Sequence, residues 1–143
     1  MDGAREHLEG RLRATTIESD GDAIRLAAED RSTGRMVGEF MLRVTSIGSR
    51  QGEIGWIVHP DAQGRGLATE GARAVLRAGF KTLDLHRIVA GADPRNAASL
   101  RVMERLGMRH EATFIEQAFI KDRWIDQLLY AILAAEWHAG SLG

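Results

Sequence analysis

The residues whose types and spacing most suggest chemistry form one short loop, Gln63-Gly64-Arg65-Gly66-Leu67-Ala68. It lies between a strand-like run that ends near Val58 and a helical stretch that begins near Ala68. The two glycines allow a sharp turn that directs successive backbone N–H groups into one concavity. The helix adds unpaired N–H groups and the positive end of its dipole, so the loop favours an anion, usually a phosphate. Arg65 adds a cation at the mouth.

The loop differs from two common phosphate-binding motifs. A nucleotide-triphosphate loop needs a Lys followed by Ser or Thr after its second glycine, and Leu67 and Ala68 stand there instead. The three-glycine fingerprint of dinucleotide-binding proteins is also absent. Two glycines before a helix are frequent in connections that bind nothing, so the interpretation depends on the surrounding motifs.

Those motifs follow one another in a fixed order. They are Ile54–Pro60, Gln63–Ala68, Thr69–Ala72, Asp93–Ser99, Arg105–Met108, Trp124–Asp126 and Tyr130. The ordered set resembles the GNAT superfamily of acetyl-CoA-dependent N-acetyltransferases, especially the branch that acetylates N-terminal alanine or serine of ribosomal proteins. The resemblance runs from about Asp22 to Trp137.

The resemblance implies a binding site for acetyl-CoA. In the family, the strand before the loop separates from its neighbour, and pantetheine lies beside it. Main-chain groups at Ile57 and Val58 would bond the pantetheine amides and the thioester oxygen, so these groups must lack partners in the sheet. The pyrophosphate would lie on the loop amides, with Thr69 as a hydroxyl contact. The residues expected to bind acetyl-CoA are Ile57, Val58, Gln63, Gly64, Arg65, Gly66, Leu67, Ala68, Thr69, Asn96 and Ser99.

Asn96 and Ser99 carry the second motif and have two compatible interpretations. As residues at a helix start, they can cap its backbone. By resemblance, Asn96 would bond pantetheine and Ser99 would lie near its sulfur. A related branch has a Tyr on this helix that protonates the leaving thiolate. Met103 stands there and cannot donate a proton, so it is expected in the core, and Ser99 or a water takes that task.

Acetyl transfer to an amine also needs a base for the ammonium proton and a group that polarises the carbonyl. Glu53 is the best candidate base, because some superfamily members keep a Glu on this strand that works through water. The alternative is an ordinary exposed strand carboxylate. His59 is interpreted as a loop residue. The five histidines are not spaced as metal ligands and the chain has no cysteine, so no metal is expected.

Composition limits the class of protein. The 143 residues predict a single domain, 1–143, that can bury a core. The net charge of −1 gives no general attraction to nucleic acid or to an anionic membrane, so neither is expected as a partner. No apolar run reaches the length of a membrane-spanning helix, and no signal peptide is recognisable. We expect a cytoplasmic protein whose partners are the small-molecule cosubstrate and an amine acceptor.

Hydrophobic periodicity predicts the elements that position these residues. Strands are expected over Asp22–Asp30, Met36–Val44, Gln51–Val58, Arg87–Ala92, Arg109–Phe119 and Asp126–Leu133. One helix follows the loop with an apolar stripe of Ala72, Val75, Leu76 and Phe80, and another runs from Asn96 to a stop at Gly107. Trp56, Trp124 and Tyr130 are expected in the core. The fold class is α/β (α+β), with a mixed, mainly antiparallel central sheet flanked by helices.

The N-terminus departs from the family pattern. Ala4, Leu8 and Leu12 predict a short helix within residues 1–20, whereas the family has a strand and a helix before the 22–137 core. With those elements missing, Asp22–Asp30 would be an edge strand, and a homodimer is expected. The last strand, through Leu128, Leu129, Ile132 and Leu133, is the other expected surface for pairing between subunits.

Three functions remain open from the sequence. The first is an N-acetyltransferase in which a primary amine attacks acetyl-CoA directly in a ternary complex, the amine being a protein N-terminus or a small molecule. The second is a non-catalytic module that binds acetyl-CoA or CoA, because elements of the acceptor site are absent. The third is a binder of nucleotide phosphates, for which the Asn96–Ser99 motif would be coincidence.

Overall fold

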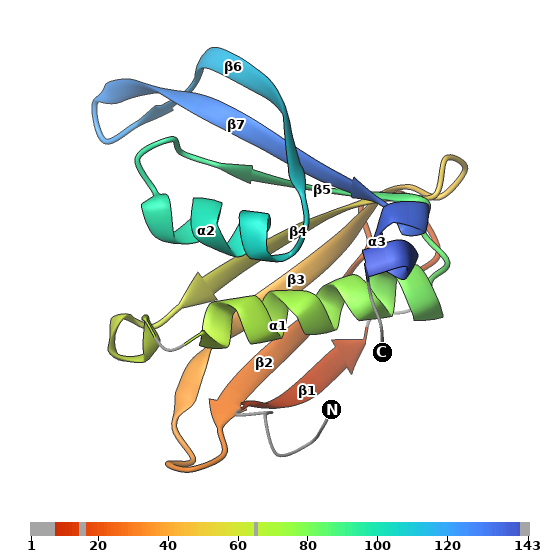
Figure 1. The fold of residues 1–143 in the computed structure, drawn as a ribbon, viewed down its shortest axis with the longest axis vertical. Helices are drawn as coiled ribbons and strands as arrows, with labels where there is room; N and C mark the ends of the chain where they lie inside the picture. Colours follow the sequence, from red (N-terminus) through yellow and green to blue (C-terminus); the bar gives the residue numbers. More distant parts are fainter. Residues whose placement is uncertain (1–7, 15–16, 65, 141–143) are drawn as a thin grey trace.

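A single mixed sheet organises the chain, as seen in a computed structural model that describes residues 8–14, 17–64 and 66–140. The strands pair in the order β1-β2-β3-β4-β5-β7-β6, and β4 and β5 are parallel while the other pairs are antiparallel. The strand bounds are β1 Leu8–Ala14, β2 Ala23–Asp30, β3 Met36–Ser46, β4 Gln51–Val58, β5 Arg87–Ala92, β6 Arg109–Ile120 and β7 Arg123–Leu133. The α-helices are α1 Leu67–Arg77, α2 Ala97–Arg105 and α3 Ala134–Gly140. This confirms the predicted fold class (Figure 1).

The N-terminal helix prediction was wrong. Residues Leu8–Ala14 form β1, which pairs with β2 so that Leu12 lies opposite Leu26. The sequence around Leu8 also alternates apolar and charged residues with the period of a strand, and pairing satisfies the outer backbone groups of β2, which a helix does not do. Ala4 lies outside the described residues. A strand therefore precedes β2, although the described residues contain no helix between β1 and β2.

This correction removes both surfaces proposed for subunit pairing. β2 is an inner strand between β1 and β3, and β7 is an inner strand between β5 and β6. The two edges of the sheet are β1 and β6. Ile132 is 3% exposed and belongs to the core.

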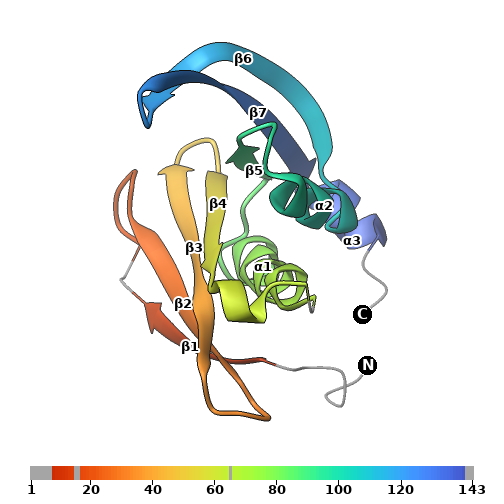
Figure 2. The same ribbon diagram turned by 90° about the vertical axis from the view of Figure 1, so that its left-hand side faces the viewer.

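The core lies between one face of the sheet and the helices. Figure 2 shows α1 and α2 on the same side of β2, β3 and β4. Along β2 and β3 the even-numbered residues from Ile24 to Asp30 and from Phe40 to Val44 are buried, whereas the odd-numbered neighbours are exposed or half-buried. The predicted stripe on the first helix is buried against this face: Ala72, Val75, Leu76 and Phe80. The opposite face of β2–β4 carries charged pairs, Arg25 with Glu39 and Arg43 with Glu53.

The aromatic predictions had mixed outcomes. Tyr130 is buried as expected, and Met103 is 1% exposed. Trp56 is only half-buried. The prediction that Trp124 lies in the core was wrong, because Trp124 is 59% exposed on the β6–β7 hairpin and contacts Phe119 edge to face. This hairpin extends beyond the helices, so its tip has no second layer to pack against (Figure 1).

The short C-terminal helix α3 was not predicted. Trp137 on α3 is buried and packs on Phe80, with ring centroids 5.5 Å apart. A network of ion pairs joins α3 to the sheet through Glu136, Arg109, Glu111 and Arg87. Hydrogen bonds from Arg87 hold the pKa of Glu111 at about 2, so this carboxylate stays ionised and structural.

Gly71 sets the distance between α1 and the sheet. A Cβ added there would lie 2.2 Å from Cζ of Phe40, which is fully buried. We expect Gly71→Ala to destabilise the domain by about 3 kcal/mol, at the upper end of overpacking costs, and to lower the Tm by roughly 10 °C. Thermal unfolding followed by circular dichroism measures this. Gly48→Ala is the control, because a Cβ at Gly48 meets nothing within 4 Å; equal Tm values for the two variants would contradict the argument.

Candidate acetyl-CoA site

The sheet opens between its two parallel strands. β4 and β5 pair only through Gln51–Arg87, Gly52–Ile88 and Glu53–Val89. The rest of β4, up to Val58, has a described partner strand on the β3 side alone. An edge of β4 that no described strand pairs with therefore lies inside the sheet, along the part of β4 where the resemblance implied one.

The register identifies which backbone groups face the opening. The His59 N–H donates to the Val37 carbonyl at 2.7 Å, and Ile57 lies opposite Glu39 in the same ladder. Because bonding direction alternates along an antiparallel pair, the N–H and C=O of Ile57 point toward β3, while those of Trp56 and Val58 point into the opening. Consistently, the Val58 carbonyl accepts a hydrogen bond from Nε2 of Gln63 at 3.2 Å. The expectation of free main-chain groups was therefore wrong for Ile57, whose groups belong to the ladder with β3, and Trp56 takes its place.

The loop before α1 has the expected turn geometry. Gly64 has a φ of 80°, and Gly66, the N-cap, has a φ of 77°. Residues with a side chain rarely adopt this left-handed backbone conformation. No side chain in the described part of the chain caps the helix, so the amides of its first turn from Leu67 onward are available to a ligand. Arg65 lies outside the described residues.

A tight turn positions the start of α2. Hydrogen bonds from Arg95 hold the pKa of Asp93 at about 2, and the same carboxylate accepts the Arg95 backbone N–H at 2.9 Å. Asn96 follows as the N-cap, and its Oδ1 accepts the Ser99 N–H at 3.1 Å. The capping interpretation is thus confirmed, and the amide NH₂ of Asn96 remains able to donate to a ligand.

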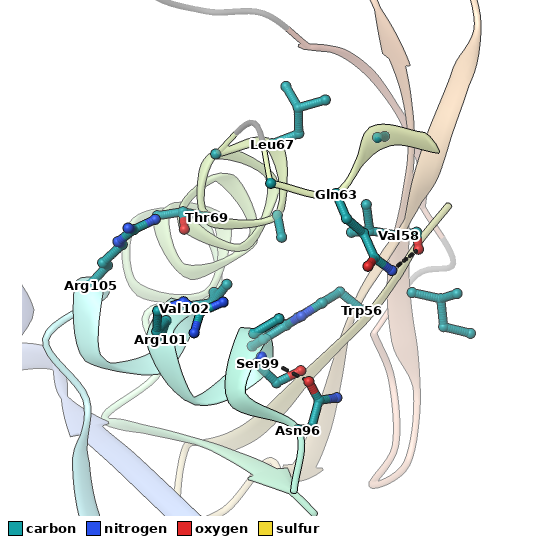
Figure 3. A pocket seen from close by; sticks show the side chains of 16 residues that line it. Trp56, Val58, Gln63, Leu67, Thr69, Asn96, Ser99, Arg101, Val102 and Arg105 are labelled. Atoms are coloured by element: carbon teal, nitrogen blue, oxygen red, sulfur yellow. Dashed lines mark hydrogen bonds between the residues drawn. The ribbon is translucent and has the colours of Figure 1, made fainter. Parts of the chain in front are cut away.

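These three features meet in one cavity of about 500 Å³, a volume typical of small-molecule sites. Figure 3 shows it between α1, α2 and β4. Ten of the predicted cofactor residues line it: Ile57, Val58, Gln63, Gly64, Gly66, Leu67, Ala68, Thr69, Asn96 and Ser99. Ile57 is 78% exposed and reaches the cavity from its rim.

Sequence reasoning missed six further lining residues: Trp56, Ala62, Ala98, Arg101, Val102 and Arg105. Four of them follow one stripe of α2, at spacings of three and four residues from Ala98. Helical periodicity counted from the predicted residue Ser99 reaches only Val102 among them, so finding the stripe required a start at its neighbour Ala98, which the motifs did not indicate.

The hydroxyl oxygen of Thr69, in the cavity, has no partner among residues 8–14, 17–64 and 66–140. Thr69 is 8% exposed, and its hydroxyl oxygen forms no hydrogen bond with any of the residues that the structure describes. Buried hydroxyls in native proteins are normally paired, so an unpaired one that lines a cavity is typical of a ligand site. Its place in the first turn of α1, beside the free amides, fits a phosphate oxygen as the missing partner.

Comparison with known families agrees with this geometry. The profile described as "Acetyltransferase (GNAT) domain" matches residues 1–109, more than half of the chain. This chain belongs to the GNAT family. Its GNAT fold is also seen in solved structures: a GNAT acetyltransferase from Bacillus anthracis is 37% identical with a TM-score of 0.72, covering 78% of this chain and 67% of that one.

Named relatives of this GNAT chain have several acceptors. Spermidine N-acetyltransferase from Vibrio cholerae, described as dodecameric, is 26% identical with a TM-score of 0.74, covering 80% of this chain and 67% of that one. N-acetyltransferase YnaD of Bacillus subtilis is 44% identical, covering 64% of this chain and 54% of YnaD. The ribosomal protein uS5 alanine N-acetyltransferase of Escherichia coli is 31% identical, covering 61% and 45%. The chain thus spans about half the length of these curated relatives.

Glu53 lies apart from the cavity of this GNAT chain. It occupies the last residue pair before β4 and β5 separate, on the sheet face opposite α1 and α2. Its side chain is 37% exposed and lies 3.7 Å from Nη1 of Arg43. Ser99 lines the cavity on the helix side. The two predicted catalytic residues therefore flank β4 from opposite faces, at the point where the sheet opens.

Two other features of this GNAT chain concern metals and membranes. Within the described residues, no group of three or more His, Asp or Glu side chains is arranged to hold a metal ion. No helix in this part of the chain is long and apolar enough to cross a membrane.

Proposed function

We propose that this GNAT domain transfers the acetyl group of acetyl-CoA to a primary amine by direct attack in a ternary complex. The observation that carries the proposal is the cavity that joins the free edge of β4 to the glycine loop and contains the unpaired Thr69 hydroxyl. A long ligand with both amides and phosphates matches it, because each part meets a different kind of backbone donor or acceptor.

The proposed donor contacts are mostly main-chain. The amides from Gly64 to Thr69 would hold the pyrophosphate, with the Thr69 hydroxyl completing that contact. The N–H and C=O groups of Trp56 and Val58 would bond the pantetheine amides as a neighbouring strand does. The NH₂ of Asn96 would donate to the same chain, and the Ser99 hydroxyl would donate a proton to the departing thiolate.

The amine would reach the acetyl group from the other face of the sheet. The separation of β4 from β5 after Glu53 opens a path from that face to the cavity. The described residues place no helix over that face of β2–β4. The amine nitrogen bonds the acetyl carbon as the carbon–sulfur bond breaks. Glu53, directly or through one water, accepts the proton that the ammonium group loses.

The acceptor class stays open between a protein N-terminus and a small-molecule amine. The names of relatives include both kinds, an alanine of ribosomal protein uS5 and spermidine. On the proposed approach face, Glu39 and Glu53 are each paired with an arginine, so neither forms a free acidic cluster of the kind that favours polyamines.

Calorimetric titration followed by a transfer assay tests the proposal. We expect acetyl-CoA and CoA to bind in the micromolar range and ATP to bind far more weakly, because ATP has no pantetheine for the edge of β4. Acetyl transfer to a panel of peptides and amines should then be detectable. Equal binding of ATP would favour a nucleotide-phosphate binder, and tight acetyl-CoA binding without transfer to any amine would favour the non-catalytic module.

We also propose a cytoplasmic homodimer, now on a different surface from the strand edges predicted by sequence. Exposed apolar side chains gather on the β6–β7 hairpin, namely Phe114, Ile115, Phe119, Ile120 and Trp124. A patch of this kind on a soluble domain is typical of an association surface. Light scattering at micromolar concentration should give twice the 15.7 kDa of one chain, and Trp124→Arg should return the mass to one chain. A monomer mass for the parent would contradict the proposal.

A further inference from the structure

Two arginines line the cavity where α1 and α2 approach one another. Arg101 and Arg105 lie one helical turn apart on α2, and Figure 3 shows the Arg105 side chain extending toward Thr69 on α1. The proposed contacts to pyrophosphate and pantetheine use the glycine loop, the edge of β4 and the start of α2. Neither arginine has a role in those contacts.

Both arginines have uncompensated charge. Within the described residues, neither guanidinium forms an ion pair with a carboxylate. Like charges four residues apart on a helix repel one another. Arg73 on α1 adds a third cation, because its Nη2 donates to the Arg105 carbonyl at 3.2 Å. A bound anion would relieve this repulsion.

The Thr69 hydroxyl, which the proposed function assigns to the pyrophosphate, lies in the cavity that the two arginines also line. It is buried, it has no hydrogen-bond partner among the described residues, and it belongs to the first turn of α1, whose amides are free. A ligand whose pyrophosphate lies on these amides could place a second phosphate against the guanidinium groups of Arg101 and Arg105.

The two kinds of donor suit different phosphates of the same ligand. CoA carries a pyrophosphate in its chain and a separate 3′-phosphate on its ribose. Backbone amides at a helix start match the pyrophosphate. Guanidinium groups match a terminal phosphate, because its three free oxygens and near-double negative charge accept bidentate hydrogen bonds.

We propose that Arg101 and Arg105 form a subsite for the 3′-phosphate of acetyl-CoA, so that this domain selects CoA thioesters over their 3′-dephospho forms. The proposal rests on the proposed function, since it requires acetyl-CoA to be the donor. It adds a specificity that the main-chain contacts cannot supply, because CoA and 3′-dephospho-CoA are identical along the pantetheine and the pyrophosphate.

Calorimetry with CoA and 3′-dephospho-CoA tests the subsite. The parent domain should bind CoA about 10- to 100-fold more tightly, the range expected for one or two charge-assisted hydrogen bonds. In the double variant R101A/R105A, CoA affinity should fall to that of 3′-dephospho-CoA, whose own affinity should change by less than about threefold. The matched control R77A/R123A removes two exposed arginines outside the cavity and gives the same net charge, so it should keep the parent preference.

The possible outcomes distinguish a failure of the proposed 3′-phosphate subsite from a failure of acetyl-CoA as the donor. Equal affinity of the parent for both ligands would overturn the subsite and leave the donor assignment intact, without needing any variant. An equal loss for both ligands in R101A/R105A would assign the arginines to the pyrophosphate and overturn the subsite. Retention of the full preference in that variant would overturn it as well. Absence of CoA binding to the parent would instead overturn the proposed function.

Discussion

Gly66→Asp is expected to abolish measurable acetyl-CoA binding. Gly66 is the N-cap of α1, and its φ of 77° is costly for any other residue. The new carboxylate would stand among the amides proposed for the pyrophosphate, where it would both repel the phosphates and accept the same N–H groups. Loss of two charge-assisted hydrogen bonds costs about 3–6 kcal/mol, or roughly 10²- to 10⁴-fold in affinity.

Gly34→Asp is the matched control for backbone strain and charge. Gly34 also has a left-handed φ, of 70°, and a Cβ there likewise meets nothing within 4 Å, but it lies in the turn between β2 and β3. Both variants should lose similar stability in thermal unfolding, while only Gly66→Asp loses acetyl-CoA affinity in calorimetry. Parent-like affinity in Gly66→Asp would show that the phosphates bind elsewhere.

The second large effect is expected at Glu53. Glu53→Gln keeps the shape of the side chain and removes its ability to take a proton, so turnover should fall by about 10²- to 10⁴-fold, the usual contribution of a positioned general base. Affinity for acetyl-CoA should stay within about twofold, because Glu53 lies on the sheet face opposite the cavity. Steady-state rates against pH, together with calorimetry, measure the two quantities.

Glu39→Gln distinguishes the role of a base from a general effect of charge on this face. Glu39 lies on β3 and pairs with Arg25 at 3.4 Å, much as Glu53 pairs with Arg43. The Glu39→Gln variant should keep turnover within about twofold of the parent, because losing a surface ion pair has a small effect. If Glu53→Gln retains parent turnover across the pH range, the base is another group.

Local patterns predicted the inner part of this fold well. β4 and β5 have the predicted bounds because alternation and flanking turns mark both ends of each strand. The glycine loop and the Asn96 cap were recognisable because each depends on residue types at short spacing. The cofactor residues chosen from those motifs share one cavity for the same reason, apart from Arg65, which the structure does not describe.

Features that depend on distant contacts were harder to predict. At the N-terminus, Leu8 and Leu12 fit a helix by their spacing of four and a strand by alternation, and only pairing with β2 decides between them. Trp124 is apolar enough for a core, but the curvature of the β6–β7 hairpin carries it away from the helices. No motif singled out Arg101 and Arg105, because their place beside the cavity depends on how α2 packs next to α1.

The three residue pairs between β4 and β5 also bear on how the domain holds together. The sheet consists of one block of four strands, β1 to β4, and one block of three, β5 to β7. The two blocks are joined by the short β4–β5 pairing and by contacts between α1 and α2. A ligand that bonds β4 on one side and the start of α2 on the other would add contacts between the two blocks of strands. The two blocks should then open independently in the empty protein and as one cooperative unit when acetyl-CoA is bound.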